Sequence, residues 1–132
     1  MRDDGTPLAA IGFNSNCTDI SKPVMPPDVK REAGLRKPQL VLMPPIAEEL
    51  TCKVLGGGAI KYGPWNWRES GVEVATYISA IKRHLAAIHR GEWLDAESGL
   101  PHMAHVAASA CIVLDADEHG CLNRDVTQTK PL

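Results

Sequence analysis

Long hydrophobic runs and an excess of positive charge are both missing from this chain of 132 residues. No apolar stretch reaches the roughly 18 residues that a membrane-spanning helix needs, so we expect no membrane span. The net charge of −2 argues against a general nucleic-acid binder, and we expect no direct nucleic-acid partner. The opening stretch MRDDGTPLAA has acids where a signal peptide needs basic residues. We therefore expect a cytoplasmic protein.

Closely spaced cysteine pairs are missing too. The four cysteines, Cys17, Cys52, Cys111 and Cys121, are far apart in sequence and form no CxxC motif. This spacing supports neither a zinc ribbon nor a thioredoxin-type motif. In a reducing compartment, free thiols are the simplest interpretation. The length and a hydrophobic content of 44% are typical of one globular domain.

Proline is concentrated in the first third of the chain. Seven of the ten prolines fall at or before Pro45. Because proline removes a backbone donor and restricts the residue before it, this region cannot form a long helix. We expect residues 1–43 to form an irregular, extended Pro-rich arm with at most a short turn or strand. Its QLVLM segment could add to a sheet edge or lie over a partner subunit.

Three segments have the hydrophobic spacing of helices. The first begins at Pro44-Pro45, since proline suits a first helical turn, and ends at the glycine triplet 56–58. The second covers about residues 71–90, where apolar residues recur at intervals of three and four. The third covers about residues 100–114, with Pro101 in its first turn. A polar, mobile tail is expected from Asp115 onward.

These segments predict an all-α fold. We expect an arm at residues 1–43, a helical domain at residues 44–115 and a polar tail at residues 116–132. Three helices of this size bury little apolar surface by themselves. We therefore expect a helical bundle whose core is completed by oligomerisation, as a dimer or tetramer.

Acidic and histidine side chains are crowded into the segment GEWLDAESGLPHMAH, residues 91–105. His102 and His105 are three residues apart on the third helix, which places their Cβ atoms about 5–6 Å from each other. Glu92 and Asp95 have the same spacing in the preceding loop. Carboxylates favour Mg²⁺ or Mn²⁺, and added imidazoles favour Mn²⁺, Co²⁺ or Zn²⁺. These four residues are the predicted metal ligands.

Two further residues belong to this prediction. His84 lies on the inward face of the second helix and completes or orients the ligand set, while Glu97 is a weaker ligand or general base. The alternative for His84 is a core imidazole bonded to a carbonyl. The alternative for the acidic loop is that Asp95, Glu97 and Ser98 cap the third helix.

Aromatic and cationic residues alternate in a second segment, KYGPWNWRES, residues 61–70. Indole and phenol rings can stack on a base, an amide can pair with a base edge, and Lys and Arg suit phosphates. The predicted substrate-binding residues are Lys61, Tyr62, Asn66, Trp67, Arg68 and, from the second helix, Arg83. The alternative is an aromatic corner that fixes the loop between two helices.

The order GGGAIKYGPWNWRE followed by RHLAAIHRGEWLDAESGLPHMAH resembles the phage dATP/dGTP diphosphohydrolase family over about residues 40–115. The resemblance implies a MazG-like all-α oligomer that depends on a divalent metal and converts dGTP to dGMP for the synthesis of 2-aminoadenine DNA. Typical MazG enzymes hold their ions with ExxE and ExxD motifs on successive helices. This sequence departs from them, because Glu92-Trp-Leu-Asp95 fits ExxD only as a loop. Glu48 and Glu49 are candidate substitutes.

The sequence and the resemblance together predict metal-dependent hydrolysis of a purine deoxynucleoside triphosphate, with dGTP as the expected substrate. Glu92, Glu97 and His84 are the expected catalytic residues, and Mg²⁺ or Mn²⁺ is the expected cofactor, with Co²⁺ or Zn²⁺ as alternatives. A host-cell cytoplasmic location follows if the chain is phage-encoded. The alternatives are a non-catalytic nucleotide-binding regulator and a phage assembly or adaptor protein.

Overall fold

The structure, a computed structural model, describes residues 26–127. Cys17, the first 25 residues of the predicted arm and residues 128–132 of the predicted tail lie outside the described part. The chain divides into two units, Met1–Leu40 and Val41–Leu132. The candidate site belongs to the second unit.

The described part of the first unit contains a helix where an extended arm was expected. Helix α2 covers Val29–Leu35, and the side chain of Asp28 caps it by accepting a hydrogen bond from the backbone N–H of Arg31 at 3.0 Å. The segment between Pro27 and Pro38 has no proline, so a short capped helix fits between them. The QLVLM segment does not add to a sheet edge, because Leu40–Leu42 form the 3-10 helix η2, and its contact with a partner subunit stays a prediction.

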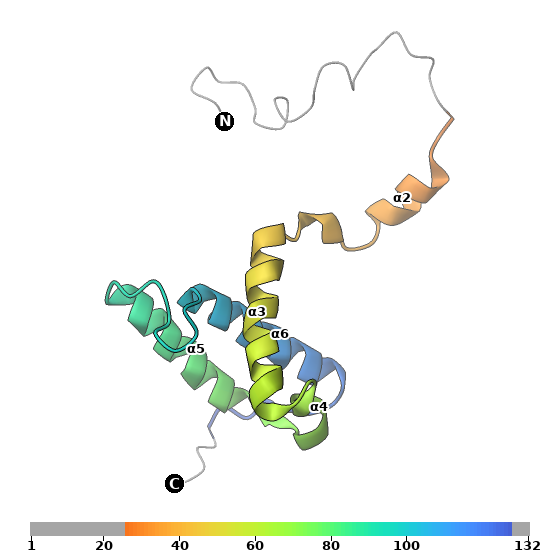
Figure 1. The fold of residues 1–132 in the computed structure, drawn as a ribbon. Helices are drawn as coiled ribbons and strands as arrows, with labels where there is room; N and C mark the ends of the chain where they lie inside the picture. Colours follow the sequence, from red (N-terminus) through yellow and green to blue (C-terminus); the bar gives the residue numbers. More distant parts are fainter. Residues whose placement is uncertain (1–25, 128–132) are drawn as a thin grey trace, which may run out of the picture. The chain divides into compact units, whose positions relative to one another are not determined.

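The second unit is built from helices and one small sheet (Figure 1). Helix α3 covers Pro45–Tyr62, α4 covers Asn66–Ser70, α5 covers Val74–His89 and α6 covers His102–Glu118. Helix α6 packs against both α5 and α3. Strands β1, Val72–Glu73, and β2, Leu122–Asn123, pair in parallel. The prediction of a helical fold is confirmed apart from this strand pair, while a MazG-like bundle and oligomerisation stay predictions.

Helix α3 begins where the sequence predicts and ends later than expected. Pro45 is its first residue, which agrees with the preference of proline for a first helical turn. The glycine triplet 56–58 does not end it, because these glycines keep helical geometry at a cost of about 1 kcal/mol each relative to alanine. The helix ends at Tyr62. Gly63 follows as its C-cap, with a φ of 89° that favours glycine.

The third predicted helix is shifted toward the C-terminus. Helix α6 starts at His102, and Pro101 precedes it as the N-cap instead of lying in its first turn. The helix continues past Leu114 to Glu118, so the expectation of a mobile tail from Asp115 is wrong for this stretch. Gly120, with a φ of 69°, follows the helix end.

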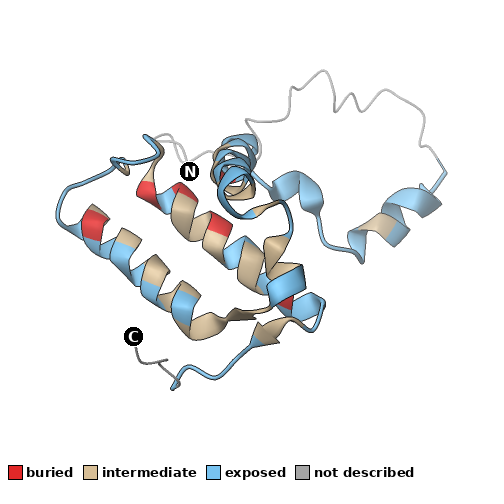
Figure 2. Ribbon diagram, turned by 60° about the horizontal axis from the view of Figure 1, so that its bottom comes forward, coloured by how far each residue is buried: buried red, intermediate tan, exposed pale blue. Residues whose placement is uncertain are grey.

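Only a few positions of the described part are buried, and the buried apolar ones are small (Figure 2). Among the described residues, the buried apolar side chains are Ala87, Ala104, Ala108 and Ala116, and none of the large apolar side chains is fully buried. Alanines let α5 and α6 approach closely, but they bury little area. Large apolar residues such as Val41 and Ile60 are 87% and 89% exposed.

Two predictions from composition can be compared with the described part. Between residues 26 and 127, no helix has both the length and the apolar character that crossing a bilayer requires. The three cysteines in this part, Cys52, Cys111 and Cys121, are all free thiols, as the sequence predicts.

Candidate functional site

Histidines from two helices meet beside the loop that joins them. His84 lies on α5, His102 and His105 lie on α6, and the loop between the helices supplies Asp95 and Ser98. Because α5 and α6 pack side by side, the three imidazoles come together although they are up to 21 residues apart in sequence, from 84 to 105. We call these five residues the histidine cluster.

The three rings of the histidine cluster are in direct contact. Nδ1 of His84 lies 2.8 Å from Nδ1 of His102. The ring of His84 also stacks on that of His105, with centroids 4.6 Å apart and planes 9° from parallel. Burial, followed by the neighbouring His105 and His102, lowers the pKa of His84. His84 is therefore held as a neutral imidazole, the form that can coordinate a cation.

His102 is the most enclosed member of the cluster. It is 6% exposed, and its Nε2 atom has no hydrogen-bond partner within the described residues. If the two facing Nδ1 atoms share one proton, His102 keeps either an unpaired N–H or an unpaired lone pair at Nε2. A buried polar atom without a partner costs about 1–3 kcal/mol. Such a group commonly marks a site that is completed by an ion, water or substrate.

Ser98 determines which ring nitrogen of His105 donates a hydrogen bond. The backbone N–H of Ser98 is the main cause that lowers the pKa of Asp95, so this carboxylate is ionised and can only accept hydrogen bonds. The Ser98 hydroxyl therefore donates to Asp95 Oδ2 at 2.9 Å. With its proton used in this way, the same oxygen must accept from Nε2–H of His105 at 2.7 Å. Nε2 of His105 is thus the hydrogen-bond donor to Ser98.

Three atoms of this cluster fit a divalent cation. Among the described residues, His84, Asp95 and His102 each offer one ligand atom, and these atoms lie within 4.8 Å of one another. Two imidazole nitrogens and one carboxylate oxygen suit Mn²⁺, Co²⁺ or Zn²⁺ better than Mg²⁺, which prefers oxygen ligands. Asp95 and His102 were predicted as ligands, and His84 was predicted to complete or orient the set. The predicted ligand His105 lies outside this three-residue group.

The loop between α5 and α6 is held in place by backbone hydrogen bonds. The N–H of Asp95 donates to the carbonyl of Leu100 at 2.8 Å, and that of His102 donates to the carbonyl of Trp93 at 3.0 Å. A positive φ of 71° at Gly99 closes the turn. These bonds keep the Asp95 carboxylate next to the start of α6.

The predicted acids other than Asp95 lie outside this three-residue group. Glu92 is exposed, and its backbone N–H bonds to the carbonyl of Ala87. Glu97 accepts a hydrogen bond from Lys61. This ion pair raises the pKa of Lys61, chiefly through the hydrogen bond. Glu49 forms an ion pair with Lys53 on the same helix, at 3.6 Å.

Trp67 and Arg68 form hydrogen bonds with Asp115, where the sequence analysis expected the tail to begin. Nε1–H of Trp67 donates to Oδ2 of Asp115 at 2.7 Å, and Arg68 donates to both carboxylate oxygens at 2.8 Å. These bonds hold the pKa of Asp115 far below its usual range. The Arg68 guanidinium also lies 4.0 Å from the ring centroid of Trp65. We call these four residues the Trp-Arg-Asp cluster.

The geometry of the Trp-Arg-Asp cluster matches the aromatic-corner alternative, because it ties α4 to the end of α6. The signal that could have revealed Asp115 is the small or apolar series Ala108, Ile112 and Ala116, which continues the helical pattern of α6 past Leu114.

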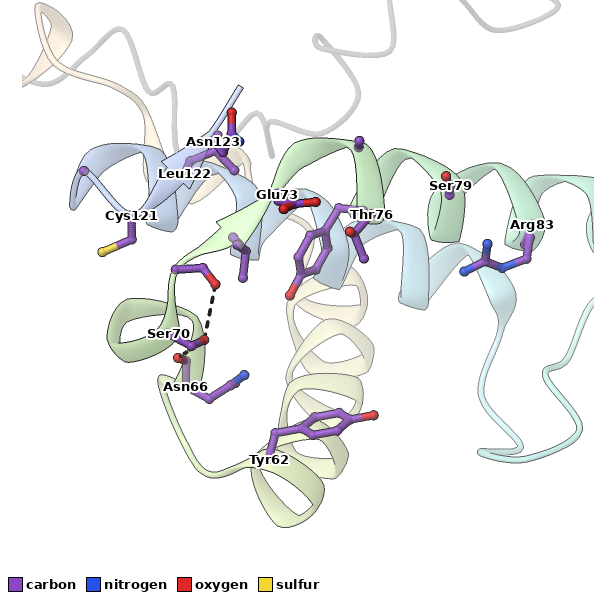
Figure 3. A pocket seen from close by; sticks show the side chains of 15 residues that line it. Tyr62, Asn66, Ser70, Glu73, Thr76, Ser79, Arg83, Cys121, Leu122 and Asn123 are labelled. Atoms are coloured by element: carbon purple, nitrogen blue, oxygen red, sulfur yellow. Dashed lines mark hydrogen bonds between the residues drawn. The ribbon is translucent and has the colours of Figure 1, made fainter. Parts of the chain in front are cut away.

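An open groove lies beside α5 (Figure 3). Its volume is about 1150 Å³, and three of the predicted substrate-binding residues, Tyr62, Asn66 and Arg83, line it. A smaller cavity of about 190 Å³ shares Tyr62, Asn66 and Tyr77 with the groove and also reaches His105. The smaller cavity, and not the groove, is therefore the space that is lined by a member of the histidine cluster. Lys61, which pairs with Glu97, does not line either space.

The fold and the site define a small helical domain that has both a group suited to a divalent cation and an open groove. The chain belongs to the family described as dATP/dGTP diphosphohydrolase, N-terminal, which matches residues 27–125. The resemblance drawn from the sequence is therefore confirmed, and the match extends beyond the expected end at residue 115.

A curated relative agrees with this assignment. The chain is 34% identical over 77 residues to a protein of Salmonella phage PMBT28 named dATP/dGTP diphosphohydrolase. The aligned region covers 58% of this chain and 26% of that relative, so the chain spans a minor part of the relative's length. No solved structure matches the chain.

Proposed function

We propose that this domain takes part in hydrolysing a purine deoxynucleoside triphosphate to the monophosphate and diphosphate, with dGTP as the preferred substrate. Membership of the dATP/dGTP diphosphohydrolase, N-terminal, family is the observation that carries this proposal. The histidine cluster and the adjoining groove support it, because such a reaction needs a charge-stabilising centre beside a nucleotide site.

His84, Asp95 and His102 are the proposed ligands of a divalent cation, with Mn²⁺ favoured by the donor set and Mg²⁺, Co²⁺ and Zn²⁺ as alternatives. When bound, such an ion neutralises phosphate charge and makes a water molecule more acidic. His105 acts beside this set, because its Nε2–H is directed to Ser98 and its ring supports that of His84. The stacking keeps the His84 ring oriented toward His102.

The exposed carboxylate of Glu92 is our candidate for the general base, since it lies on the same loop as Asp95. Glu97, the other candidate, is held by Lys61 at the surface. We assign Glu97 a role in fixing the loop to the end of α3.

Substrate contacts are proposed for the predicted residues that line the groove. Arg83 of α5 lines the groove, and we assign its guanidinium to the phosphates of the substrate. Tyr62 offers an aromatic face and Asn66 an amide to the nucleoside. Trp67 and Arg68 act indirectly, because their hydrogen bonds to Asp115 hold α4, which carries Asn66.

A role in supplying dGMP for 2-aminoadenine DNA is the wider proposal, and it derives from the sequence resemblance. Self-association is proposed from the exposed apolar side chains and the alanine-rich interior of the described part. Light scattering during gel filtration tests it, and a monomer at all concentrations would contradict it.

Product analysis by chromatography tests the central proposal. The purified protein is incubated with each of the four dNTPs, GTP and ATP, with Mg²⁺, Mn²⁺ or Co²⁺, and with EDTA. We expect purine monophosphate and diphosphate, with the highest rate for dGTP and no product in EDTA. A rise in the melting temperature with Mn²⁺ reports cation binding without turnover. Nucleotide binding without product would favour the regulator alternative. No effect of metal or nucleotide would favour an assembly protein.

A further inference from the structure

The smaller cavity, of about 190 Å³, is lined by residues from all four helices α3, α4, α5 and α6. A protein cavity of about 150 Å³ can hold a benzene ring, whereas sites for whole drug-sized ligands span roughly 300–1,000 Å³. This cavity is therefore too small for a complete nucleotide and large enough for one heteroaromatic ring system. We call it the interhelical cavity.

Gly58 of α3 leaves open space at one wall of the interhelical cavity. It is half-buried and lines the cavity, while Gly56 and Gly57 are exposed and do not line it. A Cβ atom added to Gly58 would meet no other helix within 4 Å. Because glycine is a poorer helix former than alanine, this position keeps the cavity open at a cost in helix stability.

The other walls of the interhelical cavity offer an aromatic face and polar groups. Trp67 is held by the hydrogen bond of its Nε1–H to Asp115, so its ring is a fixed part of the lining. Asn66, Tyr77 and Ser109 also line the cavity, and within residues 26–127 their side chains have no hydrogen-bond partner. An amide, a phenol and a hydroxyl supply both donors and acceptors. Aromatic rings combined with a few such groups suit a nucleobase.

The interhelical cavity borders the histidine cluster. His105 lines the cavity, and its ring stacks on that of His84, a proposed cation ligand, with centroids 4.6 Å apart. Tyr62, Asn66 and Tyr77 line both the cavity and the groove. A base bound in the cavity therefore leaves the sugar and phosphates of the same nucleotide close to these two features.

We propose that the interhelical cavity binds the base of the nucleotide and that Gly58 provides the space for its ring, an inference that rests on the proposed nucleotide-hydrolysing function. Glycine lets a ligand approach the backbone closely, since it has no Cβ atom. A larger side chain at position 58 fills the cavity and excludes the base, while groups that bind phosphate stay in place. Helix stability and base binding therefore make opposite demands on this residue.

The test compares Gly58→Leu with the matched control Gly57→Leu, which adds the same side chain at an exposed neighbour outside the cavity. Both replacements should raise the melting temperature, because leucine is a better helix former than glycine. Calorimetry measures binding of dGMP and, in parallel, of inorganic tripolyphosphate, which has no base. We expect Gly58→Leu to weaken dGMP binding by at least about tenfold and to leave tripolyphosphate binding unchanged. Gly57→Leu should bind both compounds as wild type does.

Gly58→Ala adds only a methyl group and should weaken dGMP binding less than Gly58→Leu does. Unchanged dGMP binding in both Gly58 variants, with a raised melting temperature, overturns the proposal and shows that the cavity is a packing void. Equal losses of dGMP and tripolyphosphate binding overturn it too, because the effect is then not confined to the base. So does a wild type that binds no dGMP. If wild type hydrolyses no nucleotide but binds dGMP in a way that depends on Gly58, hydrolysis fails as the function and the base site stands.

Discussion

Helix α6 carries a polar cluster near each of its ends, and the two differ in how completely their hydrogen bonds are satisfied. His102 and Asp115 are separated by 13 residues, or about 20 Å along the helix. Asp115 accepts three hydrogen bonds from Trp67 and Arg68. Within residues 26–127, Nε2 of His102 has no hydrogen-bond partner, and its Nδ1 lies against another imidazole nitrogen.

This difference distinguishes a cluster that stabilises the fold from a cluster that is a candidate for ligand binding. The Asp115 carboxylate is satisfied by its own cluster, and a network of this kind stabilises the fold. A buried imidazole with an unpaired atom costs stability, and that cost is recovered when a cation or substrate binds. Sequence composition does not distinguish the two clusters, since both contain aromatic rings, acids and basic groups.

Replacement of His102 should give the largest effect on function. In His102→Ala, the cation group loses a nitrogen ligand, and we expect kcat/KM for dGTP to fall by at least about a hundredfold. The Mn²⁺-induced rise in melting temperature should disappear as well. His89→Ala is the control, because His89 is exposed on α5 and should leave both readouts unchanged. Retained Mn²⁺ stabilisation in His102→Ala would show that the cation binds elsewhere.

Replacement of Ser98 should have the next largest effect. Ser98→Ala removes the acceptor of the His105 Nε2–H and a donor to Asp95, so both side chains lose orientation. We expect a loss of roughly ten- to a hundredfold in Mn²⁺ affinity or activity, as is common for residues that orient ligands. Ser98→Thr keeps the hydroxyl and should restore most of the activity. Equal activity in Ser98→Ala and wild type would show that Ser98 does not position His105 and Asp95.

Replacement of Asp115 should mainly lower stability. Because the folded-state pKa of Asp115 lies below its ordinary value of 3.8, its ionised form stabilises the fold above that pH. The contribution is lost as the pH falls through the lower folded-state value. Asp115→Asn should thus lower the free energy of unfolding at pH 7, with a melting temperature reduced by a few degrees. The difference from wild type should shrink as the pH falls below 3.8.

Urea unfolding at pH 7 and in acid measures this dependence. Asp117→Asn is the matched control, because Asp117 pairs with Arg124 at the surface, where ion pairs contribute little. A difference between wild type and Asp115→Asn that is independent of pH would mean that packing, not charge, explains the loss.

Loss of the Lys61–Glu97 ion pair should have the smallest effect. Both side chains are largely exposed, so screening by solvent leaves the pair with little effect on stability. We expect Lys61→Met to change kcat/KM by less than about threefold. A fall of tenfold or more, with unchanged stability, would instead support the predicted contact of Lys61 with phosphate.

Local sequence patterns determined a substantial part of this protein. Helix α5, the start of α3 and the loop before α6 follow from hydrophobic spacing and from proline at positions 45 and 101. The i, i+3 spacing of His102 and His105 placed both imidazoles near one point, since helical geometry alone brings such residues together. Each of these features depends on residues that are close together in the sequence.

Tertiary packing decided which predicted residues act together. Contact between α5 and α6 brought His84 against His102, and extension of α6 past Leu114 delivered Asp115 to Trp67 and Arg68. The groove likewise exists only because α3, α4, α5 and β2 meet. Sequence spacing carries no information about such partners, because they lie tens of residues apart and are joined only when the helices pack.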